Sequence, residues 1–227
     1  MTTTAVANQK GGVAKTTSVH ALGVAMAERG AKVLLVDLDP QASLSWACGV
    51  DPDSLELSIH DVLLNRAKVP DVLITLEPPA PATPGGPVGV LHLLPSTIDL
   101  AGAELHLLTK TGREYVLRKA LSKVADRYDR VLIDCPPSLG ILTINGLTAA
   151  DEVLIPLQCE SLSQRGVGQL LDTIDDVRDY TNEDLQVRGA IATLFDGRTR
   201  LAHDVVAQVR EQYDITVFEP FVPKSVK

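Results

Sequence analysis

Short apolar segments alternate with segments of helical periodicity along almost the whole chain. Each apolar segment is long enough for one buried strand, and the segments between them have apolar residues at the three- and four-residue spacing of a helix. The expected strands are residues 3–8, 31–39, 89–95, 129–137, 151–158 and 187–195, and the expected helices are residues 14–30, 97–108, 112–128 and 163–180. Strands that alternate with helices pair in parallel and carry helices on both faces. The sequence therefore predicts an α/β fold with a doubly wound, mostly parallel sheet.

The size and composition of the chain fit one large domain. Its 227 residues are 45% hydrophobic but only 4% aromatic, so the core must consist of Val, Leu, Ile and Ala, which suits α/β layers. We therefore expect a single domain over residues 1–227. Residues 77–89, EPPAPATPGGPVG, are too rich in Pro and Gly for a helix or a central strand, and we expect a surface loop there.

Charge and cysteine content indicate the compartment. The net charge of −8 opposes a general attraction to nucleic acid but allows a local basic patch. Cys48, Cys135 and Cys159 are odd in number and far apart, which favours buried thiols in a reducing compartment. There is no signal-peptide pattern, and no apolar run reaches the ~20 residues that span a bilayer. We expect a cytoplasmic protein that does not enter a membrane.

The stretch QKGGVAKTT, residues 9–17, lies between the first expected strand and the first expected helix. A strand, a turn with glycines and a helix N-terminus form the setting of a phosphate-binding loop. Gly11 and Gly12 can take positive φ, so that successive N–H groups face an anion. Lys15 can reach the β- and γ-phosphates, and the Thr16 hydroxyl can bind Mg²⁺. The alternative is an ordinary turn before a helix that begins Lys-Thr-Thr.

The spacing of this loop departs from the usual G-x-x-x-x-G-K-[ST], because Gln9 and Ala14 occupy the two glycine positions. KGGVAKTT instead resembles K-G-G-x-G-K-[ST], the deviant Walker A motif of the ParA/MinD branch of P-loop ATPases. The resemblance implies a P-loop NTPase that binds ATP and Mg²⁺. The implied nucleotide-binding residues of the loop are Lys10, Gly11, Gly12, Val13, Ala14, Lys15, Thr16 and Thr17. The family has a third glycine at position 14, so a Cβ is tolerable there only if the backbone is not at positive φ.

Carboxylates follow two expected strands at their carboxyl ends, where ligands bind in open parallel sheets. Asp37 and Asp39 lie in VLLVDLDPQAS, and Asp134 follows four apolar residues in RVLIDCPPSLG. Alone, the first pair fits a turn and Asp134 fits a capping residue, but beside a phosphate loop magnesium and water explain them better. The stretches resemble the ParA motif D-x-D-P-Q and a Walker B strand. This implies that Asp39 orients or activates the attacking water, and that Asp37 and Asp134 support the metal.

The neighbouring Cys135 is interpreted as a core thiol, because one Cys is not a ligand set for an iron–sulfur cluster. Lys15 serves the phosphates of its own site, and Lys10 has no obvious partner there. The family places this second lysine on the nucleotide of the facing subunit in a dimer, where it acts much as an arginine finger does. The catalytic residues implied by the resemblance are Lys10, Lys15 and Asp39.

Two later stretches also resemble the family. ATLFDGRTRLAHDVV resembles its loop near the adenine base, and FVPKSVK resembles its base-contacting segment, which implies contacts from Asp196, Pro223 and Ser225. The family brings both loops to one face of the dimer, and the basic residues there that we expect to bind DNA are Arg198, Arg200, Lys224 and Lys227. The alternative is that they are ordinary solvated charges. Family members usually continue some tens of residues further, so we expect that a C-terminal segment is missing.

The resemblance implies a ParA/Soj-type ATPase that segregates chromosomes or plasmids. ATP-dependent homodimers bind double-stranded DNA non-specifically on the nucleoid, and a ParB-type centromere-binding protein stimulates a weak intrinsic hydrolysis. A MinD-like division-site ATPase needs a C-terminal amphipathic helix, which this chain lacks. A metabolic ligase of the same fold would turn over a small carboxylate and ignore DNA. A non-catalytic nucleotide binder fits poorly with Lys10, Asp39 and Asp134 together.

Overall fold

The structure is a computed structural model that describes residues 1–160 and 163–224. Its strands are β1 Thr2–Val6, β2 Lys32–Asp37, β3 Ile74–Thr75, β4 Val90–Leu94, β5 Arg130–Asp134, β6 Glu152–Gln158, β7 Gln186–Thr193 and β8 Val217–Phe218. Its helices are α1 Lys15–Ala27, α2 Ser43–Ala47, α3 Ile59–Leu63, α4 Val69–Val72, α5 Leu100–Leu108, α6 Val116–Leu121, α7 Ile141–Ala149, α8 Ser163–Tyr180 and α9 Arg200–Tyr213. Short 3₁₀ turns cover Pro52–Ser54, Arg113–Tyr115 and Ser122–Arg127.

In the described residues, eight strands form one sheet in the order β3-β4-β2-β5-β1-β6-β7-β8. Every neighbouring pair is parallel except β3 and β4, which are antiparallel. From β1 the chain proceeds to β2 on one side, and later from β5 across to β6 on the other, so the strand order reverses around β1. Ligands bind at the carboxyl ends of the strands at such a reversal. The predicted fold class is confirmed.

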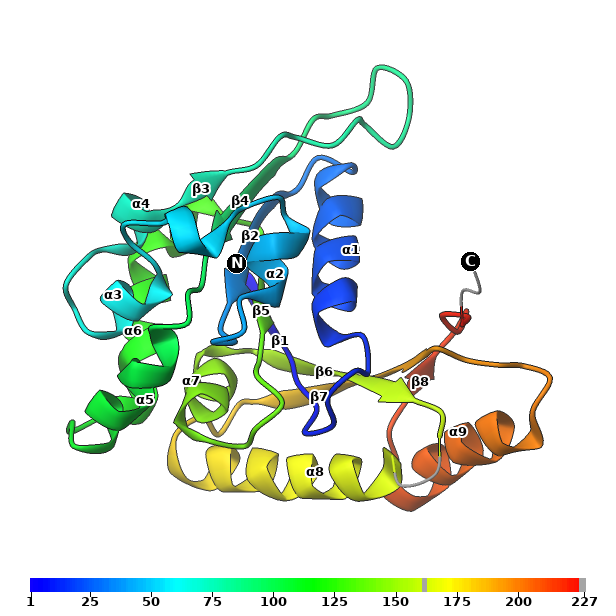
Figure 1. The fold of residues 1–227 in the computed structure, drawn as a ribbon. Coiled ribbons are helices and arrows are strands. Elements are labelled where there is room, and N and C mark those ends of the chain that lie inside the picture. The colour runs from blue at the N-terminus through cyan, green and yellow to red at the C-terminus, as the bar shows by residue number, and fades with distance from the viewer. Residues whose placement is uncertain (161–162, 225–227) are drawn as a thin grey trace.

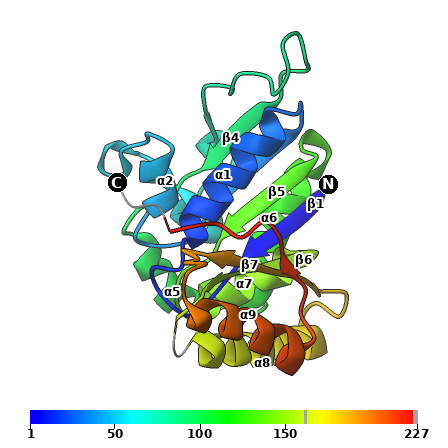
Figure 2. The ribbon, with the colours of Figure 1, turned by 90° about the vertical axis from the view of Figure 1, so that its right-hand side faces the viewer.

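Helices cover both faces of the sheet (Figures 1 and 2). Helices α1 and α2 pack on one face, where Val33 and Leu35 of β2 contribute to the smaller core. The remaining helices pack on the other face, where Leu34 and Val36 point into the larger core. Successive side chains of a strand face opposite sides, so a strand buried on both faces must be apolar at every position, as β2 is. This explains why continuous apolar runs predicted the strands.

Helix α1 approaches the sheet very closely. Its buried residues recur every four positions, at Lys15, Val19, Gly23 and Ala27. A Cβ on Gly23 would lie 2.5 Å from Cδ2 of Leu35, so any larger residue there would have to displace the Leu35 side chain. The contact fixes the position of α1, and therefore of the loop that leads into it.

Residues 77–89 contain no helix or strand and, apart from Gly89, are exposed or half-buried. The segment extends away from the sheet (Figure 1) between β3 and β4. It is anchored at its middle and at its end to the C-terminus of α1, because the N–H of Ala82 donates to the carbonyl of Glu28 and that of Gly89 to the carbonyl of Ala27. Two short strands, β3 and β8, and helices α2, α3, α4, α7 and α9 were not among the expected elements.

The expected helix over residues 112–128 is not continuous. It consists of the 3₁₀ turn Arg113–Tyr115, helix α6 and the 3₁₀ turn Ser122–Arg127. Buried Asn145 of α7 accounts for part of the irregularity, because its side chain accepts from the N–H of Leu117 and donates to the carbonyl of Arg113. These bonds fix the start of α6 to α7. Long-range polar contacts of this kind leave no mark on local periodicity.

Candidate functional site

Residues 7–14 connect β1 to α1 and lie at the carboxyl edge of the sheet. Gly12 has φ of 75°, and a Cβ on Gly11 or Gly12 would meet no atom within 4 Å. The loop is therefore open on this side, as the approach of a phosphate to its backbone requires. The predicted turn between a strand and a helix N-terminus is present.

Two buried side chains hold this loop against the neighbouring strands. The amide of Asn8 donates to the carbonyl of Pro156 in β6 at 2.7 Å, and its oxygen accepts from the N–H of Lys10 at 3.0 Å. The hydroxyl of Thr193, at the end of β7, donates to the carbonyl of Val13 at 2.9 Å. Sequence reasoning missed both residues. The available signal was a buried polar residue at the end of an apolar strand, which must bond to something.

Ala14 contradicts the expectation made for it. Its backbone lies in the left-handed region, with φ of 62° and ψ of 34°, at the N-cap of α1. The family glycine at this position is therefore explained by backbone conformation, and the chain tolerates a Cβ there at a cost of roughly 1–2 kcal/mol. Helix α1 begins immediately afterwards, so the loop stores this strain at the point where it meets the helix.

Lys15 is buried at the base of the loop, with 8% of its surface exposed. Its ammonium group donates to the carbonyl of Lys10 at 3.2 Å, across the loop. Burial lowers the pKa of Lys15, while the charges of Asp134 and Asp39 oppose that shift. A positive charge that water does not solvate gains more from a phosphate than an exposed one does.

Thr16 and Asp134 are hydrogen-bonded to each other at the edge of the sheet. The Thr16 hydroxyl donates to Oδ2 of Asp134 at 2.6 Å. The other oxygen, Oδ1, is buried and has no hydrogen-bond partner among the described residues. Burial raises the pKa of Asp134 to about 7, with the Thr16 bond acting in the opposite direction. A hydroxyl and an unpaired carboxylate oxygen are the hard oxygen ligands that Mg²⁺ prefers, so these residues fit the metal.

Asp37 lies beside Asp134, its register partner on the adjacent strand. It is fully buried, and burial raises its pKa to about 6. Its Oδ2 accepts from both the N–H and the hydroxyl of Ser45 at 2.8 Å, and its Oδ1 accepts from the N–H of Asp39 at 3.3 Å. Asp37 therefore connects β2 to α2, a role that the sequence did not indicate. Its support of the metal stays a prediction.

Asp39 differs from both buried carboxylates because it is only half-buried. Its Oδ1 accepts from the N–H of Gln41 at 2.9 Å, which closes a tight turn of the type that the Asp-Pro pair favours. The charge of the Asp39 carboxylate acts on Lys15 and opposes the lowering of its pKa. The sequence brought Asp39, Lys15 and Asp134 to one edge of the sheet, as expected.

Lys10 has a partner in its own chain, contrary to expectation. Its ammonium group lies 3.3 Å from Oε2 of Glu160, just after β6. Both side chains are partly exposed, at 33% and 54%. An exposed pair of this kind contributes little stability and is readily exchanged for another partner.

The two C-terminal segments lie side by side, as predicted. Phe195 forms a bridge with Pro223, and its carbonyl accepts from the N–H of Lys224 at 3.1 Å. Phe195 also packs on Phe221 and His203. Pro223 is therefore located near residues 194–199, whereas Ser225 and Lys227 lie outside the described residues.

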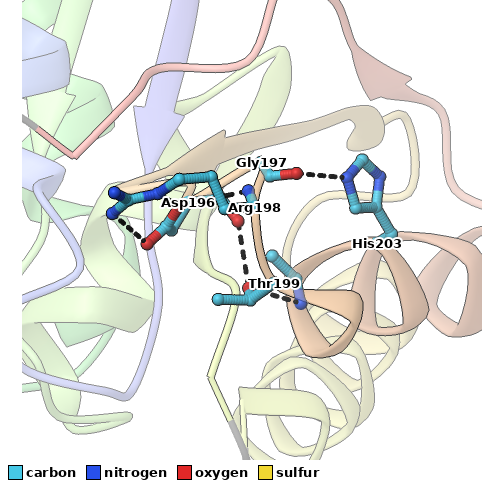
Figure 3. A network of polar contacts seen from close by, with 6 residues as sticks. Asp196, Gly197, Arg198, Thr199 and His203 are labelled. Atoms are coloured by element: carbon cyan, nitrogen blue, oxygen red, sulfur yellow. Dashed lines mark hydrogen bonds and ion pairs between the residues drawn. The ribbon is translucent and has the colours of Figure 1, made fainter.

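Asp196 and Arg198 bind each other within their loop (Figure 3). The guanidinium donates two bonds of 2.9 Å to the two carboxylate oxygens, and the Arg198 N–H adds one of 3.1 Å. Arg198 thereby lowers the pKa of Asp196 to about 2. Arg200 was expected in the same loop as Arg198, but it is instead the first residue of α9. Both carboxylate oxygens of Asp196 are bonded to Arg198. The contact of Asp196 with adenine stays a prediction.

The three cysteines are free. Cys135 is fully buried and Cys159 is buried, but Cys48 is half-exposed, contrary to expectation. No group of three or more His, Cys, Asp or Glu side chains among the described residues could hold a metal on its own. No helix in the described part of the chain is long and apolar enough to cross a membrane.

A glycine loop between a central strand and a helix, with a buried lysine and a strand-end carboxylate facing it, defines a P-loop nucleotide-binding protein. Comparison with known proteins refines this class. A profile for an AAA domain family matches residues 1–187. The chromosome partitioning protein ParA of Myxococcus xanthus is 42% identical over 98% of this chain and 75% of its own length. The sporulation initiation inhibitor protein Soj of Bacillus subtilis is 41% identical over 98% of this chain and 84% of its own.

A similar solved structure carries the name of an enzyme and not of a partitioning protein. Cobyrinic acid a,c-diamide synthase from Mycobacterium smegmatis, with bound ATP analogue and magnesium, superposes with a TM-score of 0.91 at 50% identity and covers 99% of this chain and 88% of that one. The same protein is also known with ADP and magnesium. The chain belongs to this AAA domain family and, within it, to the ParA/Soj group of P-loop ATPases.

Proposed function

We propose that the protein is a ParA-type ATPase that segregates DNA and uses ATP with Mg²⁺. One observation carries the nucleotide part of the proposal, namely the unpaired buried oxygen of Asp134 beside the Thr16 hydroxyl and the Lys15 ammonium group. Two buried carboxylates next to each other and a desolvated lysine are unfavourable alone, and Mg²⁺ with a triphosphate matches their charges. The ATP- and ADP-bound relatives support this assignment.

In this proposal the open backbone of Gly11 to Thr17 and the Lys15 ammonium group bind the β- and γ-phosphates. Thr16 and Asp134 hold Mg²⁺, with Asp37 behind them, and the metal neutralises charge on the phosphates. Asp39 reaches into solvent from the same edge and orients the attacking water. Phosphoryl transfer needs mostly positioning and charge stabilisation, so weak intrinsic activity is expected of an isolated subunit.

Lys10 completes the site of the facing subunit in a dimer. Its bond to Glu160 is exposed and weak, so that a γ-phosphate across the interface is a better partner. Lys10→Ala should keep nucleotide binding by the monomer and lose hydrolysis. Sedimentation tests this directly: the parent protein should be a dimer with ATP and a monomer with ADP, and monomers under both conditions would contradict the role.

DNA binding is assigned to the surface of Arg198, Arg200, Lys224 and Lys227. The segments of the first three adjoin through the bridge from Phe195 to Pro223, and Arg198 is 86% exposed. Dimerisation doubles this surface, so binding should require ATP. It should ignore sequence, because phosphate contacts carry no base information, and it should weaken steeply with salt.

The test is ATP hydrolysis and a mobility shift with random duplex DNA, each with ATP or ADP and with or without a ParB-type partner. DNA and partner together should stimulate hydrolysis. Arg198→Glu/Arg200→Glu should lose DNA binding, while the charge-matched control Arg29→Glu/Arg127→Glu keeps it. Equal DNA binding with ADP, or equal binding by the first variant, would refute the surface.

The diamide synthase at 50% identity supports a second candidate, an amide-forming ligase that acts on a carboxylate. The two functions differ in what accelerates ATP consumption. Cobyrinic acid with an ammonia donor should have no effect on a partitioning ATPase, whereas a ligase would form amide and ignore DNA. Several ParA and Soj relatives at 40–44% identity over almost the whole chain favour the first function.

A further inference from the structure

A hollow of about 120 Å³ lies far from the phosphate loop in the fold, between the loop that joins α3 to α4, the turn after α5, and α6. These elements form the left-hand part of Figure 1. The sequence contains nine lysines, which are Lys10, Lys15, Lys32, Lys68, Lys110, Lys119, Lys123, Lys224 and Lys227. Four of them line this one hollow, namely Lys68, Lys110, Lys119 and Lys123. We call it the lysine hollow.

The charge of the lysine hollow contrasts with that of the chain. The protein has 29 acidic residues and a net charge of −8, yet no lining residue among those described is acidic. None of the ion pairs between described residues involves the four lysines. Four positive charges around one hollow repel one another, and an anion of high charge would relieve that repulsion.

The lysines come from three separate segments that the fold brings together. Lys119 lies on α6 and Lys123 on the 3₁₀ turn that follows it, and both line the hollow. Lys68 comes from the opposite rim, just before α4. Lys110 follows α5, and its ammonium group lies 3.5 Å from the carbonyl of Leu63, which directs it across the hollow.

The backbone around the lysine hollow is fixed. Asn65 and Gly112 lie at its rims with positive φ, 58° and 64°. Buried Asn145 holds both Arg113 and Leu117, which bracket the start of α6. The lysines therefore extend from a defined frame, and binding requires only that their side chains be ordered.

We propose that the lysine hollow binds a small, multiply charged phosphate anion of about the size of pyrophosphate. Lysine ammonium groups are established phosphate ligands, and Thr111 on the lining adds a hydroxyl donor. The hollow has room for one or two phosphate groups, and its four lysines surround that space, whereas a DNA duplex contacts lysines that are spread along a surface. The site is independent of the proposed partitioning function.

Calorimetry with pyrophosphate tests the proposal, with the phosphate loop saturated by ADP and a fixed excess of Mg²⁺. One further site should be detected, and Lys119→Ala/Lys123→Ala should weaken it by about tenfold or more. The control Lys32→Ala, an exposed lysine on β2, should bind as the parent does. The same titration in a Lys15→Ala background removes competition from the loop. Absence of the second site, or equal affinity in the double variant, would overturn the proposal.

A second measurement does not depend on a variant that folds. An amine-acetylating reagent should modify Lys119 and Lys123 more slowly when pyrophosphate is present, and Lys32 at an unchanged rate, as read by mass spectrometry. Inorganic phosphate, tripolyphosphate and a short random duplex serve as parallel probes. If only the duplex protects the two lysines, the surface contacts DNA and the small-anion proposal is wrong.

Discussion

Lys15 and the four lysines of the lysine hollow show two ways in which one chain presents positive charge. At the phosphate loop the charge is buried, the nearby Asp134 has an unpaired oxygen, and Ala14 holds a left-handed backbone. In the lysine hollow, three of the four lysines are exposed. The backbone beside them is held by Asn145, which hydrogen-bonds the carbonyl of Arg113 and the N–H of Leu117. The loop therefore stores unfavourable free energy that a ligand can release, whereas the hollow stores little.

The phosphate loop and the lysine hollow should therefore respond to substitution with different effects on stability. Substitutions at the phosphate loop should reduce function and in some cases increase the stability of the ligand-free protein. Substitutions in the lysine hollow should leave stability almost unchanged. The five changes below test the contrast in order of decreasing effect.

Lys15→Ala should have the largest effect. Removal of one desolvated charge from a phosphate contact costs about 2–5 kcal/mol, so affinity for an ATP analogue with Mg²⁺ should fall by about 30-fold or more. Isothermal titration calorimetry measures this, with Lys32→Ala as the exposed-lysine control. Unchanged affinity would show that Lys15 does not bind the phosphates and that the P-loop assignment is wrong.

Asp39→Ala should reduce ATP hydrolysis by about 100-fold and leave ATP affinity unchanged, because Asp39 is only half-buried and does not bond the loop. The variant should accumulate as an ATP-bound dimer. A phosphate-release assay with gel filtration tests both points, and Asp53→Ala is the control for an exposed carboxylate. Normal turnover would assign the water-orienting role to another residue.

Asp134→Asn should stabilise the ligand-free protein at alkaline pH. Burial raises the pKa of Asp134 to about 7 and that of Asp37 to about 6, so the folded protein holds protons that the unfolded chain has already lost. This contribution is complete below the ordinary pKa of 3.8 and is lost as the pH rises through 6 to 7. At about pH 8 in EDTA, the variant should therefore exceed the parent by about 1–2 kcal/mol.

Urea unfolding at about pH 5 and about pH 8 measures this difference. The variant should also show a flatter dependence of unfolding free energy on pH, since only one of these two buried carboxylates, Asp37, remains to titrate. Added Mg²⁺ and ADP should stabilise the parent more than the variant. Parallel pH profiles for the two proteins would show that Asp134 does not titrate in this range.

Ala14→Gly should raise the free energy of unfolding by about 0.5–1 kcal/mol. Relief of the left-handed alanine gains about 1–2 kcal/mol, and the greater freedom of glycine in the unfolded chain offsets part of that gain. Ala101→Gly on the exposed face of α5 is the matched control and should lose about 1 kcal/mol. If both changes destabilise equally, Ala14 is not strained.

Lys119→Ala/Lys123→Ala should change the unfolding free energy by less than about 0.5 kcal/mol, because both side chains are exposed and unpaired. Loss of repulsion between like charges four residues apart can even stabilise the protein slightly. Thermal unfolding in low salt is the sensitive measurement. A loss of more than about 1 kcal/mol would mean that the hollow is structural, like the phosphate loop frame.

Local signals were enough to predict the main features of this molecule. Apolar runs such as residues 31–39 predicted the central strands, and the K-G-G-x-x-K-T spacing predicted the loop, because both depend on neighbours in sequence. Parallel pairing then brought Asp37, Asp39 and Asp134 to one edge without further information.

What the sequence did not indicate depends on contacts between distant segments. Ser45 binding to Asp37, Glu160 to Lys10 and Thr193 to Val13 each join segments whose spacing carries no pattern. The conformation of Ala14 was also missed, because an alanine gives no sign of positive φ by itself. Short elements such as β8 form only because β7 supplies an edge.

Thr193 is both the last residue of β7 and the donor to the carbonyl of Val13. A displacement of Val13 by more than a few tenths of an ångström must either lengthen this buried bond or move the end of β7. Phe195 follows two residues later and packs on Phe221, and Arg198 lies three residues beyond it. One hydroxyl group thus ties the phosphate loop to the end of the strand that leads into the Arg198 loop.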